Sequence, residues 1–176
     1  MLKPVSNDVN IGRVGGVVVL YEPDERIISN IVSYVDCLHT LIIVDNSSQE
    51  NTIIEEYFSN KKNVRYIFNN GNLGIGAALN KGGDFALENG CTWLLTMDQD
   101  SYFDAIQISN YVEWIHTKSP ENLAITGINF DSARGEQASG EIVVSPVSKV
   151  ITSGSMVNLK YWQALNGFDE KLFIDE

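Results

Sequence analysis

Short apolar runs that alternate with segments of helical periodicity constrain the fold of this chain more than any other feature. The runs are rich in β-branched residues, as is typical of strands that are buried on both faces. They occupy residues 14–20, 41–44, 64–68 and 92–97. The helical segments between them occupy residues 24–35, 51–59 and 75–88. This strand–helix order predicts an α/β fold with a mainly parallel sheet, helices on both faces and right-handed crossovers.

The second half of the sequence continues this pattern less regularly. We predict a helix at 104–118, strands at 123–128 and 150–157, and a short helix at 161–165. The two strands are separated by residues 131–149, which are rich in Ser, Gly and charge and therefore predict an irregular segment.

The domain organisation that we expect is simple. A flexible leader at residues 1–13 is polar and aperiodic, and one domain at 14–176 follows it. Residues 172–176 form an apolar run that enters two carboxylates with no closing element. We therefore expect the domain to be truncated at its C-terminus.

The formal net charge of −11 limits the partners of the chain. Nucleic acid is excluded, because its phosphate backbone is bound by basic surfaces. An acidic protein that binds phosphates needs a bridging divalent cation, so the charge directs attention to clustered carboxylates. No apolar stretch approaches the ~20 residues of a membrane-spanning helix, and the N-terminus lacks a signal-peptide pattern. We expect a cytoplasmic protein.

The polar residues that follow the predicted strands are the first candidates for a binding site. Ligands of open α/β sheets bind outside the carboxyl ends of the strands. Here those ends carry Tyr21, Asp45, the loop 69–76 and the segment 98–100. Ordinary turn chemistry is the alternative, since Asp45 can cap the next turn, and Asn and Gly in the loop favour left-handed conformations.

The Asp-x-Asp motif (DXD) of Asp98 and Asp100 is the most informative segment. The apolar run 92–97 leads directly into it. In an extended chain, residues i and i+2 point to the same side, so both carboxylates would face one ligand. Such oxygen donors suit Mg²⁺ or Mn²⁺, with a diphosphate completing the coordination shell. The alternative is an Asx-type turn at the end of the strand.

The order of these segments resembles that of family 2 glycosyltransferases, which have the GT-A fold with a Rossmann-like sheet. The matching segments are 17–21, 42–48, 70–74, 98–100, 153–155, 167–170 and 173–176. The pairing of NGNLG at 70–74 with MDQD at 97–100 looks most like the bacterial rhamnosyltransferases, whose donor is dTDP-L-rhamnose. The resemblance implies an inverting hexosyltransferase that uses a dTDP- or UDP-sugar and a saccharide or lipid-linked saccharide acceptor in surface polysaccharide synthesis.

The resemblance also assigns roles on the nucleotide side. Tyr21 would border the nucleobase, and Asp45 would accept a hydrogen bond from the ring N–H of thymine or uracil. Asn72 and Gly74 would lie in the loop that wraps the nucleotide, and Asn80 on the helix behind it. The nucleotide would thus be held by residues from several strand ends.

Further roles concern the metal, the acceptor and the chemistry. By resemblance, Asp98 would contact the ribose or the water shell of the metal, and Asp100 would ligate the metal directly. Gly154 and Ser155 would line the acceptor side. Glu176 matches the catalytic base, with Asp175 as its acidic neighbour. The base would remove a proton from the acceptor hydroxyl, whose oxygen attacks the anomeric carbon opposite the leaving diphosphate.

Two alternatives and one departure remain open. A nucleotidyltransferase normally has a basic, Gly-rich loop after the first strand, whereas residues 21–24 are acidic. A nucleotide-sugar-binding fragment without activity is the second alternative. Glu22 stands where relatives often have Asn, which puts a ribose contact there in question. A lipid-linked acceptor would bring the enzyme to the inner face of the cell membrane, through segments outside this sequence.

Overall fold

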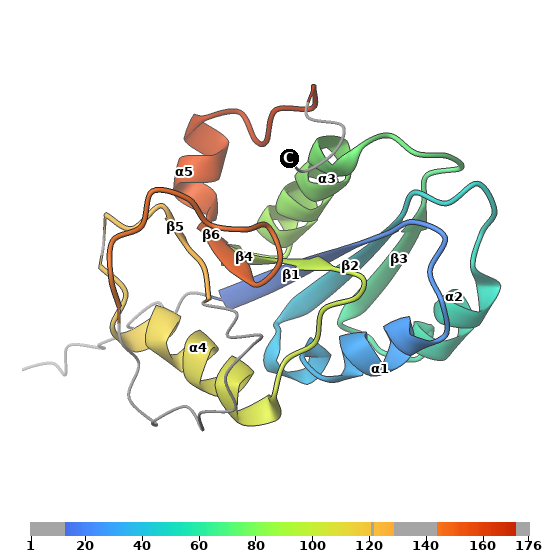
Figure 1. Cartoon of the computed structure of the whole chain (residues 1–176), viewed down its shortest axis with the longest axis horizontal. Helices are drawn as coiled ribbons and strands as arrows, with labels where there is room; N and C mark the ends of the chain where they lie inside the picture. Colours follow the sequence, from blue (N-terminus) through green and yellow to red (C-terminus); the bar gives the residue numbers. More distant parts are fainter. Residues whose placement is uncertain (1–12, 121, 129–143, 172–176) are drawn as a thin grey trace, which may run out of the picture.

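A computed structural model describes residues 13–120, 122–128 and 144–171. The strands within these ranges are β1 (Arg13–Leu20), β2 (Thr40–Asp45), β3 (Val64–Phe68), β4 (Cys91–Asp98), β5 (Ile125–Thr126) and β6 (Ser155–Asn158). They form one sheet in the order β3-β2-β1-β4-β6-β5 (Figure 1). β1, β2, β3 and β4 run parallel to one another, whereas β6 runs antiparallel to its two neighbours, β4 and β5. The predicted mainly parallel sheet is confirmed.

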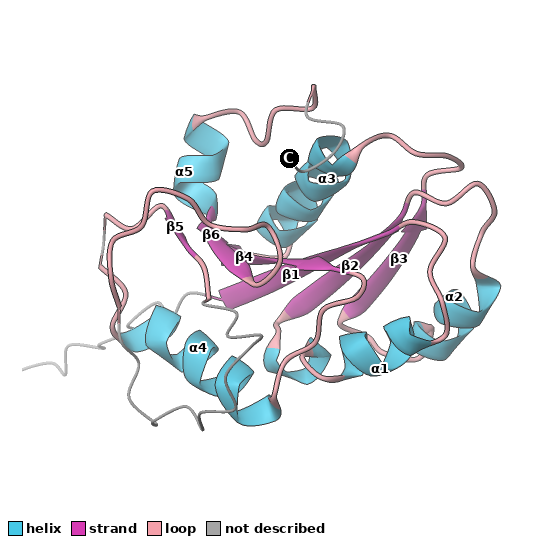
Figure 2. Cartoon of the chain, viewed as in Figure 1, coloured by secondary structure: helices cyan, strands magenta, loops and turns pink. Residues whose placement is uncertain are grey.

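Helices cover both faces of this sheet (Figure 2). They are α1 (Arg26–Val32), α2 (Thr52–Phe58), α3 (Ile75–Glu88), α4 (Ala105–Thr117) and α5 (Leu159–Ala164), with the 3-10 helix η1 (Val35–Cys37) after α1. α1, α2 and α4 lie on one face, and α3 and α5 lie on the other. Side chains of β1 alternate between the two cores: Val18 packs with the first group of helices and Val17 with the second. Residues on both sides of the strand are therefore buried, which explains its continuous apolar run.

Two glycines let α3 pack closely against its neighbours. A Cβ at Gly82 would overlap the side chain of Val17 in β1. A Cβ at Gly83 would lie 2.5 Å from Cζ2 of Trp162 in α5. The glycine pair thus brings α3 into direct contact with both the parallel strands and the antiparallel end of the fold.

The two strands of the antiparallel end are shorter than predicted. We expected strands at 123–128 and 150–157, but β5 and β6 cover only Ile125–Thr126 and Ser155–Asn158. The chain turns just before β6 at Gly154, where φ is 75°. The Gly154 N–H donates to the Thr96 carbonyl at 2.8 Å, so the regular pairing of β6 with β4 begins directly after this turn.

Several other bounds also differ from the prediction. The helical pattern at 24–35 divides into α1 and η1. α5 begins at Leu159, because the side chain of Asn158 caps its first turn by accepting a hydrogen bond from the Lys160 N–H. Arg13, which we assigned to the leader, is the first residue of β1. The rest of the leader and residues 131–143 lie outside the described residues. Among the described helices, none has the length and apolarity needed to span a membrane.

Candidate functional site

The carboxyl ends of the four parallel strands meet at one edge of the sheet. Asp45 lies beside Leu20 at the end of β1 and beside Phe68 at the end of β3. Asp98 lies beside Val19 of β1. Tyr21 follows β1 directly, so the sheet brings the predicted nucleotide-side residues to one place. This is the edge at which open α/β sheets bind their ligands.

The two aspartates of the DXD motif do not share an extended backbone. Asp98 is the last residue of β4, and Gln99 and Asp100 form a turn that is closed by a 3.3 Å hydrogen bond from the Ser101 N–H to the Asp98 carbonyl. The extended backbone that the i and i+2 spacing was expected to provide is therefore absent, because β4 ends at Asp98. Asp98 is half-buried, whereas Asp100 is exposed. Their metal-binding roles stay predictions.

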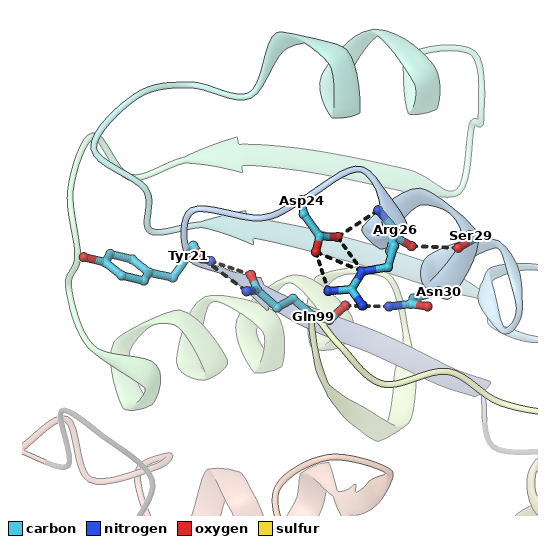
Figure 3. A network of polar contacts seen from close by, with 6 residues as sticks. All are labelled: Tyr21, Asp24, Arg26, Ser29, Asn30 and Gln99. Carbon is cyan, nitrogen blue, oxygen red and sulfur yellow. Dashed lines mark hydrogen bonds and ion pairs between the residues drawn. The ribbon is translucent and has the colours of Figure 1, made fainter.

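Gln99, which we did not predict as a site residue, ties this turn to the end of β1 (Figure 3). Its side-chain amide makes two hydrogen bonds with the backbone of Tyr21: Oε1 accepts from the N–H at 2.8 Å, and Nε2 donates to the carbonyl at 3.2 Å. The Gln99 carbonyl accepts from Asn30 Nδ2 of α1 at 2.9 Å. The Tyr21 side chain itself stays 54% exposed and accessible to a ligand. The position of Gln99 between two aspartates was the only signal in the sequence.

Charged side chains beside this turn are paired with near neighbours. Glu22 has a left-handed backbone (φ 45°), and its carboxylate accepts hydrogen bonds from the backbone N–H and the hydroxyl of Ser48 at 3.0 and 2.8 Å. These bonds lower the pKa of Glu22, so its charge is held against Ser48. The Arg26 guanidinium folds back onto Asp24 (Figure 3), which lowers the pKa of that carboxyl.

Asp45 is completely buried and already has two partners. Its Oδ1 accepts from the Ser47 N–H at 2.9 Å, and its Oδ2 accepts from the Tyr66 hydroxyl at 2.5 Å. Burial and this hydrogen bond raise the pKa of Tyr66. The turn-capping alternative for Asp45 is thus confirmed. The nucleobase role stays a prediction, and contact with a base requires the surrounding residues to move apart.

The loop after β3 is held by a network of side-chain amides. Asn72 Oδ1 accepts from the Gly74 N–H at 2.9 Å and lies 3.4 Å from Asn46 Nδ2. Asn46 Oδ1 in turn accepts from Asn69 Nδ2 at 2.7 Å. Gly74 has φ 85°, so the expected left-handed turn chemistry is present as well. Sequence reasoning assigned no role to Asn46, Asn69 or their partner Lys81, because amide pairing depends on tertiary contacts.

Asn80 has different partners from the nucleotide that we expected. Its Oδ1 accepts from the Phe168 N–H at 2.7 Å, and its Nδ2 donates to the Phe168 carbonyl and to Glu170 Oε1, each at 3.0 Å. A Cβ at Gly167 would lie 2.5 Å from Asn80 Oδ1. In this structure Asn80 therefore anchors the segment 167–170 to α3, and its contact with a nucleotide stays a prediction.

The acceptor-side residues lie beside a cavity of about 180 Å³ between α3 and β6. Gly154 and Ser155 are buried, and the Ser155 hydroxyl donates to the Ile151 carbonyl at 2.5 Å. Ser155 lines the cavity, whereas Gly154 does not. The remaining walls include Ile75, Thr96, Thr152, Phe168 and Asp169. Asp175 and Glu176 lie outside the described residues.

A divalent cation at this edge would need ligands from the substrate. Within the described ranges, no group of three or more His, Cys, Asp and Glu side chains is close enough to hold a metal ion. The half-buried Asp98 and the exposed Asp100 supply hard oxygen donors, which suit Mg²⁺ or Mn²⁺ when phosphate oxygens and water complete the shell. The residues present fit such a shared site.

Two of three similar solved structures agree with the fold. Residues 1–349 of TarS from S. aureus match with a TM-score of 0.59 and 17% identity over 92% of this chain and 52% of that chain. The 4-diphosphocytidyl-2C-methyl-D-erythritol synthase from Anaerococcus prevotii matches with a TM-score of 0.56 and 15% identity over 89% and 74%. GalNAc-T7, solved with UDP, GalNAc and Mn²⁺, matches with a TM-score of 0.45 and 16% identity over 60% and 22%.

The similarities to TarS and to the diphosphocytidyl synthase show the architecture of the chain. The mixed α/β sheet is of the predicted GT-A type. The chain spans about half of the TarS structure that it matches. No curated protein sequence matches the chain. The sequence model of glycosyl transferase family 2 matches residues 25–166, which form most of the chain and include Asp45, Asp98 and Asp100. By this match, the chain belongs to glycosyl transferase family 2.

Proposed function

We propose that this chain binds a nucleoside diphosphate sugar at the carboxyl edge of its parallel strands and serves in the transfer of that sugar. One observation carries the proposal. In a family 2 chain, Asp98 and the exposed Asp100 leave β4 beside Tyr21, to which Gln99 fixes them by two hydrogen bonds. This edge is acidic, and the chain has a net charge of −11. A diphosphate can bind there when a divalent cation offsets both charges.

Different residues of this edge would contact different parts of the nucleotide. The exposed ring of Tyr21 borders the nucleobase, and the loop from Asn72 to Gly74 wraps the nucleotide. Asp45 accepts a hydrogen bond from the imide N–H of thymine or uracil, once the site opens to expose it. Asp98 faces the ribose or the water shell of the cation. These contacts select a pyrimidine diphosphate, and dTDP-L-rhamnose is the best candidate donor.

The proposed chemistry is a single displacement with inversion. Glu176, with Asp175 beside it, removes the proton from the acceptor hydroxyl, whose oxygen then attacks the anomeric carbon. When bound at Asp100, Mg²⁺ or Mn²⁺ would offset the charge on the leaving diphosphate. In this proposal, the cavity that Ser155 lines admits part of the acceptor. The acceptor is a saccharide or lipid-linked saccharide of surface polysaccharide synthesis, which would be reached in the cytoplasm at the inner face of the membrane.

The experiment compares ligands of the two competing reaction types. The chain is titrated calorimetrically with dTDP, UDP, CDP and dTTP in the presence of Mn²⁺. We expect dTDP and UDP to bind more tightly than CDP and dTTP. Preference for the triphosphate would support a nucleotidyltransferase and contradict the proposal. That outcome needs a test because a diphosphocytidyl synthase shares the fold. The same chain is then supplied with dTDP-L-rhamnose and an acceptor extract, and release of dTDP is measured.

A further inference from the structure

A chain of hydrogen-bonded amides connects α3 to the loop that wraps the nucleotide. Lys81, on α3, donates from Nζ to Asn69 Oδ1. Asn69 Nδ2 donates to Asn46 Oδ1 at 2.7 Å. Asn46 Nδ2 lies 3.4 Å from Asn72 Oδ1 and 3.3 Å from the Gly74 carbonyl, to both of which it donates. This series of hydrogen bonds begins at the Lys81 ammonium group and ends at the backbone of Gly74.

Both ends of this chain fix the direction of its hydrogen bonds. A lysine ammonium can only donate, so Asn69 must turn its oxygen toward Lys81 and its NH₂ toward Asn46. At the other end, the Gly74 N–H donates to Asn72 Oδ1, and the Gly74 carbonyl can only accept. Asn46 is 3% exposed, so a reversed amide there would leave buried donors and acceptors mismatched.

The fixed direction decides which group Asn72 offers to a ligand. Its Oδ1 is occupied by the Gly74 N–H and Asn46, whereas its Nδ2 has no hydrogen-bond partner among the described residues. Asn72 is exposed, so this NH₂ group can donate to a ligand. The carbonyl oxygens of a pyrimidine and the oxygens of a diphosphate are the acceptors that suit it.

Lys81 differs in its pairing from the other described lysine that bonds to another side chain. Lys61 forms an ion pair with Asp36 at 2.6 Å, whereas Lys81 is paired with an amide. This is so although the protein is rich in carboxylates. An amide can transmit the direction of a hydrogen bond, because it accepts on one side and donates on the other. A carboxylate cannot do so, since it only accepts.

We propose that Lys81 is a positioning residue that holds the hydrogen-bond direction of the loop from the end opposite Gly74, so that Asn72 presents a donor to the nucleoside diphosphate. The inference rests on the proposed function. Lys81 would act through Asn69 and Asn46, and the contact with the nucleotide would be a hydrogen bond from Asn72 to one of its oxygen atoms. Lys81 itself lies on a different element from the loop that it orients.

Asn69→Asp is the decisive variant. The carboxylate keeps its pairing with Lys81 and adds charge attraction, but it cannot donate to Asn46. We expect dTDP affinity in Mn²⁺ to fall roughly tenfold, as for the loss of one well-formed hydrogen bond. If Lys81 only stabilised α3, Asn69→Asp would bind dTDP as tightly as the wild type, and the proposal would be overturned.

Asn72→Asp removes the proposed donor and keeps the acceptor for Gly74. We expect a similar loss of roughly tenfold from this substitution alone. The double variant Asn69→Asp/Asn72→Asp should bind dTDP almost as tightly as either single variant, because both substitutions remove the same contact with the nucleotide. Additive losses in the double variant would contradict the inference. Thermal unfolding of each variant separates a loss of binding from a loss of folded protein.

Lys61→Met is the matched control for Lys81→Met. Both remove one ammonium group, but Lys61 pairs with an exposed carboxylate that our proposal does not use. Lys81→Met should weaken dTDP binding roughly tenfold, and Lys61→Met should leave it unchanged. Equal effects would overturn the proposal. If Lys81→Met does not unfold cooperatively, the two asparagine variants decide. A wild-type chain that binds no nucleotide would instead refute the proposed function itself.

Discussion

The parallel and antiparallel ends of the sheet treat their polar groups differently. At the ends of β1, β2 and β3, polar side chains bond to one another: Asp45 to Tyr66, Glu22 to Ser48, and Asn46 to its neighbouring amides. Around β6, the polar groups instead bond mainly to nearby backbone, and they border a largely apolar cavity. The parallel end therefore carries a network of polar side chains, whereas the antiparallel end borders the cavity.

This difference matches the two tasks of a sugar transferase. A nucleoside diphosphate has a fixed set of donors and acceptors, and groups that are already in position lose little freedom when they bind it. An acceptor saccharide is recognised by shape as well as by hydrogen bonds. We therefore expect substitutions at the parallel end to change nucleotide affinity, and those near the cavity to change acceptor use.

The largest effect is expected for Asp100→Ala. Loss of this carboxylate should abolish metal-dependent binding of dTDP and leave the fold intact, because Asp100 is exposed. Calorimetry with Mn²⁺ and thermal unfolding measure the two effects. Asp84→Asn is the control, since it removes an equal charge from an exposed position on α3. Binding of dTDP to Asp100→Ala at wild-type strength would remove the metal role of Asp100.

Asp45→Asn should weaken dTDP and UDP roughly tenfold or more and reduce the preference over CDP. The asparagine keeps an acceptor for the Ser47 N–H and places an NH₂ group beside the Tyr66 oxygen, so the buried site stays paired. CDP serves as the internal control, because cytosine lacks the imide N–H. If wild-type protein bound all three diphosphates equally, Asp45 would only cap its turn.

Substitutions of Gly82 and Gly83 in α3 test whether the parallel and antiparallel ends of the sheet are equally rigid. Gly82→Ala forces a methyl group into the stiff Val17 side chain of β1, and we expect a net loss of about 1–2 kcal/mol, since overpacking outweighs the gain in helix propensity. Gly83→Ala meets Trp162 on the short helix α5, which can shift, so its loss should be smaller. Urea unfolding of both variants measures the difference. Equal losses would mean that both ends are equally rigid.

The smallest effect is expected for Gln99→Ala. This variant loses two hydrogen bonds to the backbone of Tyr21, both at a partly exposed site, so dTDP affinity should fall only a few-fold. Gln163→Ala, at an exposed position of α5, is the control and should have no effect. A loss as large as that of Asp100→Ala would show that Gln99 contacts the ligand directly.

The sequence predicted the parallel end more closely than the antiparallel end, for physical reasons. β3 and α3 have the predicted bounds. α3 buries one regular face, which leaves clear periodicity in its sequence, and β3 is a short apolar run bounded by turn residues. β5 has only the residues Ile125–Thr126, one of them exposed, so its pattern was too short to delimit. The turn at Gly154 depends on a hydrogen bond to Thr96, far away in the sequence.

The candidate site was predicted in its location and less well in its contacts. The rule that ligands bind at the carboxyl edge of a parallel sheet predicts that Tyr21, Asp45 and Asp98 lie together, and the strand register places them there. Local spacing did not decide between an extended backbone and a turn after Asp98, because the end of a strand is set by pairing with its neighbours. Asn80 and Lys81 are adjacent in the sequence but serve different segments, which only the packing of α3 reveals.

The most direct test of the account is the metal dependence of nucleotide binding by the unaltered chain. dTDP is titrated calorimetrically in saturating Mn²⁺ and again in excess EDTA. We predict measurable binding with Mn²⁺ and none in EDTA, because an acidic edge that contains Asp98 and Asp100 repels a bare diphosphate. Equal affinity in the two conditions would show that the diphosphate binds without a cation, and would contradict the proposed role of the DXD motif.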